Sequence, residues 1–321
     1  KEAIIKGISR GDIWLAKIRR DQHGERIYAN VCLEVFIKSR GTCLLEHISL
    51  GACEVDEIPK AFAAGMQELC ELHSKTGVST SGEYLPSDED RQVGLGMLGL
   101  ANLLSLEGVT YAEFGHALEF HNGMTGISEP TLASLKIVQA LQAGLDAASA
   151  IARKHKMDRA FAIAPTASCS YRYEDRAGYT TTPEIAPPIG RKVDRDSSTF
   201  GVQTYDYGNV ETAEEVGWDV YKQVVDGIMT MVHATGLSHG YSFNSWSDVV
   251  IYDSQFVQEW LDSPQTSLYY SLQVMQNTQA KDDAMAALDE NFEFDFSGFD
   301  DADDEIVDLF NDPAGCVGCA E

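Results

Sequence analysis

The spacing of apolar side chains along the chain predicts several helices. Residues 56–73 carry apolar side chains largely on one side of a helix, and residues 213–235 repeat this pattern with Val, Ile and Met. The pattern also predicts helices over residues 93–106, 111–121 and 130–156, the last opened by a proline in its first turn. Long helices therefore account for much of the chain between residues 56 and 235.

Short apolar segments lie between these helices and predict strands. Residues 29–37 are rich in Val and Ile, residues 43–50 form a second such segment, and residues 160–164 form a third. A long polar connection over residues 174–207 contains scattered apolar side chains, so we expect it to be ordered. Because helix and strand recur in alternation, the fold class is α/β.

A glycine motif lies within the predicted helix at residues 93–106. Gly94, Gly96 and Gly99 match the G-x-G-x-x-G pattern of dinucleotide-binding proteins. That function requires a buried strand directly before the motif, whereas the preceding residues 87–91 are polar and charged. We therefore interpret these glycines as positions of close helix packing.

The charge of the chain excludes two classes of partner. The formal net charge is −26, and binding to nucleic acid or to an anionic membrane needs a basic face. The richest apolar run, residues 93–106, is too short to span a membrane. Seven cysteines in a chain of 321 residues, without a signal-like start, indicate a reducing, cytoplasmic location. Because the chain starts without Met, we expect an excerpt or a processed product.

The composition changes near residue 281. From Asp282 to Glu321 the chain contains many Asp and Glu residues and no Lys or Arg, which is typical of a solvated, mobile arm. Phenylalanines interleaved with these acids suggest that parts of the arm dock onto another surface. We expect two parts: an α/β part over residues 1–280 and an acidic mobile tail over residues 281–321.

The candidate chemistry centres on the thiols. Asn30, Cys32 and Glu34 occupy alternating positions, so in an extended segment their side chains point to the same side. A cysteine beside a carboxylate, with Cys43 nearby and a C-x-x-C pair on a mobile tail, is typical of a site that uses thiols as redox reagents. The tail pair is Cys316 and Cys319. It is not a zinc site, because the sequence has no second ligand pair at suitable spacing.

Two further segments allow a structural and a functional interpretation. The turn after the predicted strand at 160–164 offers hydroxyls and backbone N–H groups that could bind an anion, or it is simply a hydroxyl-rich turn. Adjacent tyrosines on a strand are usually core aromatics, and they could stack only in an irregular local geometry. These residues are Pro165, Thr166, Ala167, Ser168, Cys169 and Ser170 in the turn, and Tyr269 and Tyr270 in the strand.

Taken in order, these motifs resemble the C-terminal half of the large, catalytic subunit of class I-like ribonucleotide reductases. The resemblance rests on residues 30–34, on Cys43, on residues 91–102, on the turn at 165–170, on the Tyr pair and on the terminal C-x-x-C. It implies part of a ten-stranded α/β barrel with the catalytic cysteine on an internal loop. It implies reduction of ribonucleotides to 2′-deoxyribonucleotides for DNA synthesis.

The resemblance also implies a role for each site residue. Cys32 matches the cysteine that becomes a thiyl radical and takes hydrogen from the ribose C3′. Glu34 matches the general base at the 3′-hydroxyl, and Asn30 matches an amide that holds the substrate. Cys43 matches one of two thiols that reduce C2′, whose partner lies in the upstream half. Residues 165–170 match the segment that cradles the substrate phosphates, with Ala167 where some members have a carboxylate.

The remaining matches imply partners. Tyr269 and Tyr270 match a radical relay from a separate, metal-containing small subunit, and Cys316 and Cys319 match a shuttle re-reduced by thioredoxin or glutaredoxin. We expect a ribonucleoside-diphosphate reductase that binds no cofactor or metal in this chain and needs the N-terminal portion of the large subunit. One alternative is a monomeric, adenosylcobalamin-dependent reductase. Another is a noncatalytic, dithiol-bearing interaction module.

Overall fold

The computed structural model describes residues 2–76, 82–196 and 201–275. A first compact unit comprises Lys1–Val193 and Tyr205–Gln276, and the fold and the site described below belong to it. The expected α/β class is confirmed: helices pack around a four-stranded parallel sheet. The ten-stranded barrel and the boundary at residue 280 stay predictions.

The central sheet has the strand order β10-β7-β6-β5, and all three pairings are parallel. Strands β6 and β7 are buried along their whole length, as expected for a parallel sheet covered on both faces. The bounds are β5 Leu45–Ser49, β6 Gln92–Leu98, β7 Arg159–Ile163 and β10 Ser238–Tyr241.

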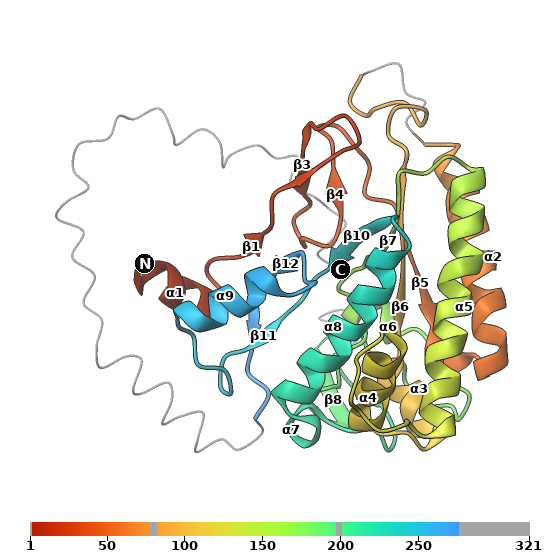
Figure 1. Ribbon diagram of the computed structural model, residues 1–321. Helices are drawn as coiled ribbons and strands as arrows, with labels where there is room; N and C mark the ends of the chain where they lie inside the picture. Colours follow the sequence, from red (N-terminus) through yellow and green to blue (C-terminus); the bar gives the residue numbers. More distant parts are fainter. Residues whose placement is uncertain (1, 77–81, 197–200, 276–321) are drawn as a thin grey trace. The chain divides into compact units, whose positions relative to one another are not determined.

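Two groups of helices pack on this sheet (Figure 1). Helix α2 packs on β5, β6 and α5, whereas α8 packs on β10 and α4. The apolar side chains predicted at helical spacing form the core between helices and sheet. The bounds are α2 Ile58–His73, α3 Leu100–Glu107, α4 Tyr111–His121, α5 Leu132–Lys154, α6 Ala167–Ser170, α7 Ala213–Val216 and α8 Trp218–Ala234, with 3-10 turns at Leu50–Ala52 and Val55–Glu57.

Smaller elements surround the sheet. A three-stranded antiparallel sheet of order β2-β3-β4 carries the Cys32 segment, and two short pairings join β1 to β12 and β11 to β13. Helix α1 Glu2–Ser9 opens the chain and α9 Ser254–Asp262 precedes β12. The strands are β1 Leu15–Ala16, β2 Arg19–Arg20, β3 Arg26–Ala29, β4 Phe36–Ile37, β8 Lys192–Asp196, β9 Val202–Asp206, β11 Ser245–Trp246, β12 Ser267–Leu268 and β13 Ser271–Leu272.

The predicted helix over residues 93–106 is wrong in its first half. Residues 92–98 form β6, and the helix begins only at Leu100, after Gly99 in a left-handed conformation. Glycine weakens a helix interior, and a continuous apolar run also fits a fully buried strand. A side chain at Gly96 would overlap the backbone of Ala162 and the ring of His47. Gly94 and Gly96 therefore serve close packing within the sheet and not between helices, whereas Gly99 follows the strand and precedes α3.

Other boundaries differ in smaller ways. The helix predicted over residues 213–235 is interrupted at Gly217, whose φ of 77° is left-handed, so that α7 and α8 are separate helices. The polar connection over residues 174–207 includes the paired strands β8 and β9. The strand predicted over residues 29–37 divides into β3 and β4, with a tight loop between them.

Candidate functional site

One predicted site segment, the turn at residues 165–170, lies at the carboxyl edge of the parallel sheet beside a residue that the sequence did not indicate, Ser242. Strand β7 leads into the turn at residues 165–170, and the neighbouring strand β10 leads into Ser242. The backbone N–H of Ser242 donates to the carbonyl of Ile163 at 3.1 Å, which joins the two strand ends. Ligands of open α/β sheets bind at this edge. Its loops are therefore placed to form a binding site.

The Cys32 segment is a closed loop between β3 and β4, not an extended strand. The backbone N–H of Asn30 donates to the carbonyl of Val35 at 2.8 Å, and the side-chain oxygen of Asn30 accepts from the Val35 N–H at 3.1 Å. Leu33 has a φ of 66°, a conformation that is unfavourable for a residue with a Cβ. The side chains of residues 30 and 34 are thus brought together by a turn, and the expected strand alternation is wrong here.

Asn30 bridges two of the other candidate residues. Its side-chain amide donates to Oε1 of Glu34 at 2.8 Å and contacts Sγ of Cys43 at 3.6 Å. Only 1% of Glu34 is exposed, and this burial raises the pKa of its carboxyl, whereas hydrogen bonds from Asn30 and Ser242 lower it. The loop therefore places a buried, titratable carboxyl close to a thiol.

Ser242 and Tyr269 face the Cys32 side of the loop. The Ser242 hydroxyl lies 2.6 Å from the carbonyl oxygen of Cys32 and 3.2 Å from Oε2 of Glu34. The Tyr269 hydroxyl lies 3.9 Å from Sγ of Cys32, which is half-buried. Burial and the neighbouring Cys32 raise the pKa of Tyr269. The structure thus brings Asn30, Cys32, Glu34, Cys43 and Tyr269 together.

The tyrosine pair lies in an irregular segment, and the two rings are in tilted contact and not stacked. Tyr269 and Tyr270 fall between β12 and β13, and their ring centroids are 4.6 Å apart at 60°. The ring of Trp14 contacts Tyr269 edge-on, with centroids 4.7 Å apart. Tyr269, which lies beside the Cys32 thiol, therefore contacts two further aromatic rings, and sequence spacing alone did not identify Trp14.

The turn at residues 165–170 is held by bonds within the chain. The Thr166 N–H donates to Oε1 of Glu184 at 3.1 Å, and the Thr166 hydroxyl accepts from the Glu184 N–H at 2.8 Å. The Ser170 hydroxyl donates to the carbonyl of Ala167 at 2.8 Å. Ser168 and Cys169 are exposed, whereas Pro165 is half-buried. Of the predicted anion-binding groups, those of Thr166 and Ser170 thus already have partners within the chain.

Glu184 is a site residue that sequence reasoning missed. It is 9% exposed, and burial, reinforced by the charge of Glu34, raises its pKa to about 7. The Tyr241 hydroxyl lies 3.5 Å from its Oε2 and 3.1 Å from the Tyr221 hydroxyl. No local motif marks Glu184, because its partners come from the ends of β7 and β10.

Other candidates lie away from the site or outside the described part. Cys53 is half-buried and Cys70 is buried, and burial raises the pKa of Cys70 to about 11. Cys316 and Cys319 belong to residues 276–321, which are outside the described residues. In the described ranges no cluster of three His, Cys, Asp or Glu side chains could hold a metal ion. Within the same ranges no helix is long and apolar enough to cross a bilayer.

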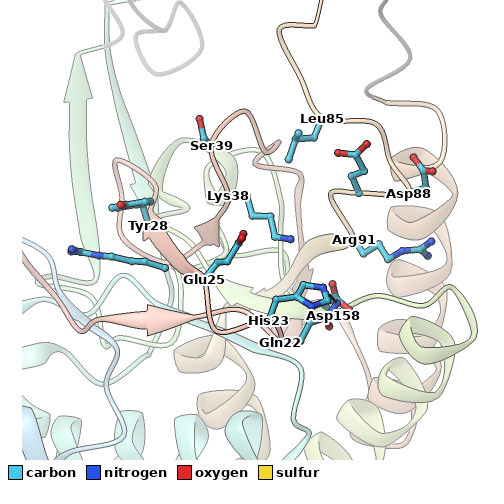
Figure 2. A pocket seen from close by; sticks show the side chains of 12 residues that line it. Gln22, His23, Glu25, Tyr28, Lys38, Ser39, Leu85, Asp88, Arg91 and Asp158 are labelled. Atoms are coloured by element: carbon cyan, nitrogen blue, oxygen red, sulfur yellow. Dashed lines mark hydrogen bonds between the residues drawn. The ribbon is translucent and has the colours of Figure 1, made fainter.

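A large hollow with charged residues in its lining lies at the hairpin of β2 and β3, apart from the site. It has a volume of about 650 Å³, and its lining includes Arg26, Lys38 and Arg91 together with Glu25 and Asp88 (Figure 2). None of the candidate site residues lines it. Charges of both signs face the hollow, so its lining indicates no single class of ligand.

Comparison with known proteins identifies the fold. A matching solved structure is the Actinobacillus ureae class Id ribonucleotide reductase alpha subunit, with a TM-score of 0.55 and 15% sequence identity. The match covers 87% of this chain and 61% of that chain. No family model and no curated protein matches the sequence. The resemblance expected from the motifs is therefore confirmed at the level of the fold.

Proposed function

We propose that this chain forms part of the catalytic subunit of a ribonucleotide reductase. Its fold is like that of such a subunit, and it spans 61% of that subunit's length. The observation that carries the proposal is the convergence on one loop of a thiol, a buried carboxyl and a second thiol, with a tyrosine hydroxyl 3.9 Å from the first sulfur.

The proposed chemistry gives each of these groups one task. Cys32, as a thiyl radical, takes a hydrogen atom from the ribose C3′, and Glu34 accepts the proton of the 3′-hydroxyl. Cys43 and a thiol from another part of the subunit are oxidised to a disulfide, and their two electrons reduce C2′ as its hydroxyl leaves as water. Cys32 then returns a hydrogen atom to C3′, and Glu34 returns the proton to the 3′-oxygen. The balance is one ribonucleotide and one dithiol to one deoxyribonucleotide, one disulfide and water.

The environment of Glu34 supports its role as a base. Burial raises the pKa of Glu34, which brings a carboxylate closer to the basicity that proton transfer from a hydroxyl needs. Asn30 donates to one oxygen of this carboxyl, so the geometry of the base is held independently of substrate. The phosphates are proposed to bind at residues 165–170, at the carboxyl edge of the same sheet.

The contact between Tyr269 and Tyr270 favours a radical supplied from outside the chain. Two phenols in ring contact, the first of them beside Cys32, form a path for stepwise oxidation of the thiol. A metal-containing small subunit is the proposed source, and thioredoxin or glutaredoxin is the proposed reductant of Cys316 and Cys319. The adenosylcobalamin-dependent reductase stays the alternative.

The direct test is nucleotide reduction by the Cys32→Ser variant. The chain is combined with the N-terminal portion of the large subunit and a radical source, and deoxyribonucleotide formation is measured by chromatography. We expect no turnover, because a serine hydroxyl does not form a comparable radical. The control is Cys53→Ser, since Cys53 is half-buried and its Sγ contacts the Ser49 carbonyl, away from the loop.

Measurable turnover by Cys32→Ser would eliminate the radical role of this thiol. Failure of the unmodified chain to bind any ribonucleotide or any complementing N-terminal portion would favour the noncatalytic interaction module instead. If Cys53→Ser were as inactive as Cys32→Ser, the loss of turnover would not be specific to the Cys32 loop.

A further inference from the structure

Ser242 contacts two parts of the Cys32 loop at once. Its hydroxyl oxygen lies 2.6 Å from the carbonyl oxygen of Cys32 and 3.2 Å from Oε2 of Glu34. Ser242 is fully buried and lies 208 positions from Glu34, at the end of β10. The other oxygen of Glu34, Oε1, accepts from the Asn30 amide at 2.8 Å. The carboxyl is therefore held on one side by an amide and on the other by a hydroxyl.

The serine hydroxyl has one proton for two acceptors. A hydroxyl can donate only one hydrogen bond, whereas the Cys32 carbonyl and an ionised Glu34 both need a donor. When Glu34 is protonated, its acid proton is donated to Ser242 and the serine proton to the Cys32 carbonyl, so every group is satisfied. When Glu34 is ionised, a charge-assisted bond to the carboxylate is the stronger one, and it draws the serine proton away from Cys32.

We propose that Ser242 is a positioning residue whose single hydroxyl proton links the charge of Glu34 to the hydrogen bond on the Cys32 carbonyl. Protonation of Glu34 turns the serine proton toward Cys32 and tightens the loop, and ionisation turns it away. Leu33, between the two residues, has an unfavourable φ of 66°, so the loop depends on such bonds to keep its shape.

This link deepens the proposed function, and it rests on that function only for its catalytic consequence. As Glu34 accepts the proton of the 3′-hydroxyl, Ser242 restores its bond to the Cys32 carbonyl and steadies the loop while the substrate radical exists. No additional oxidant or reductant takes part, because the only change is the transfer of one proton and the rotation of one hydroxyl.

Other titratable groups also act on Glu34. Glu184 and Tyr269 lie within electrostatic range, the first from the segment after the turn at 165–170 and the second from the end of β12. The thiols of Cys32 and Cys43 adjoin the same loop. Burial of Glu34 raises its pKa, and the Ser242 hydroxyl opposes that rise. A test must therefore compare variants that differ only at the serine hydroxyl.

The test is an infrared titration of the full chain. The carbonyl stretch of protonated Glu34 is followed against pH, and it is assigned as the band that the Glu34→Gln variant lacks. In Ser242→Ala we expect the midpoint to move upward by about one pH unit, because the ionised carboxylate loses a charge-assisted hydrogen bond. Ser242→Thr keeps a hydroxyl and should restore the original midpoint.

A second infrared measurement follows the Cys32 carbonyl itself. Cysteine labelled with a heavy carbonyl carbon gives a band that Cys32→Ser identifies by its loss. In the unmodified chain this band should shift as Glu34 ionises, because the carbonyl loses its hydrogen bond, and in Ser242→Ala it should stay constant with pH. The matched control is Ser267→Ala, because Ser267 is also fully buried but donates to the Tyr241 carbonyl.

An unchanged or lowered Glu34 midpoint in Ser242→Ala overturns the proposal, and so does an equal upward shift in Ser267→Ala. If Ser242→Thr does not fold, the alanine variant and the labelled carbonyl still decide. Turnover distinguishes this proposal from the proposed function. If the unmodified assembly is inactive but still shows both infrared signatures, the reductase function is refuted, and the link between Glu34 and the Cys32 carbonyl through Ser242 still holds. If the assembly is active but the acidic side of its pH–rate profile does not shift in Ser242→Ala, the proposed effect of Ser242 on catalysis is refuted.

Discussion

Glu184 makes the stability of the fold depend on pH, and the Glu184→Gln variant isolates its contribution. Its carboxyl is 9% exposed and holds the turn at 165–170 through the Thr166 N–H, at 3.1 Å. Burial first, and then the charge of Glu34, raise the pKa of Glu184 from 4.5 to about 7. The folded state therefore keeps the proton over a pH range in which the unfolded chain has lost it.

The sign of the effect follows from this difference in bound protons. Between pH 4.5 and 7 the folded state binds more protons at Glu184 than the unfolded state does, so its stability falls as pH rises through this window. At roughly 1.4 kcal/mol per pH unit, the full loss is about 3 kcal/mol above pH 7. Glutamine keeps a carbonyl oxygen for the Thr166 N–H and does not titrate. The variant therefore does not undergo this fall in the free energy of unfolding.

The assay is urea-induced unfolding of the chain, followed by circular dichroism at several pH values between 4 and 8. We expect the free energy of unfolding of Glu184→Gln, relative to the unmodified chain, to increase by about 3 kcal/mol across the window. The exposed Glu129→Gln variant is the control for the loss of one charge. A difference between Glu184→Gln and the unmodified chain that stays constant with pH would refute the reasoning.

Two further predictions concern the sheet and the relay. Gly96→Ala should destabilise the fold by about 2 kcal/mol, because the added methyl group overlaps the Ala162 backbone and the His47 ring, and a urea midpoint equal to that of the unmodified chain would contradict this packing. Tyr270→Phe should abolish turnover, and added adenosylcobalamin should not restore it. The control variant Tyr28→Phe, which changes an exposed ring, should stay active. Turnover that depends on adenosylcobalamin and survives Tyr270→Phe would favour the cobalamin-dependent class instead.

The sequence predicted those elements whose pattern is determined locally. The helix at residues 111–121 agrees with α4 at both ends, because a capping box at Thr110 and Glu113 and a regular apolar face both specify it. The helix predicted over residues 93–106 is wrong in its first half, because a buried parallel strand and a buried helix have the same unbroken apolar run. Only the neighbouring strands, which leave no room for side chains at Gly94 and Gly96, decide between them.

The site residues also include some that the sequence could predict and some that it could not. Asn30, Cys32 and Glu34 could be found from their spacing, because all three lie within five residues. Ser242 and Glu184 could not, because they reach the site from distant elements and stand in no motif. Ser242 directly follows β10, and Glu184 is bonded to Thr166, which follows β7; the parallel order of these strands brings the two strand ends together.

The central claim is that the Cys32 sulfur removes hydrogen from the ribose C3′, and substrate deuterated at C3′ tests it most directly. The unmodified assembly is given normal and 3′-deuterated ribonucleotide, and the rate of deoxyribonucleotide formation is compared under single-turnover conditions. We expect a primary isotope effect on product formation with the 3′-deuterated substrate, and none when deuterium is placed at C5′ instead. Equal rates with normal and 3′-deuterated substrate, in an assembly whose chemical step limits the rate, would contradict it.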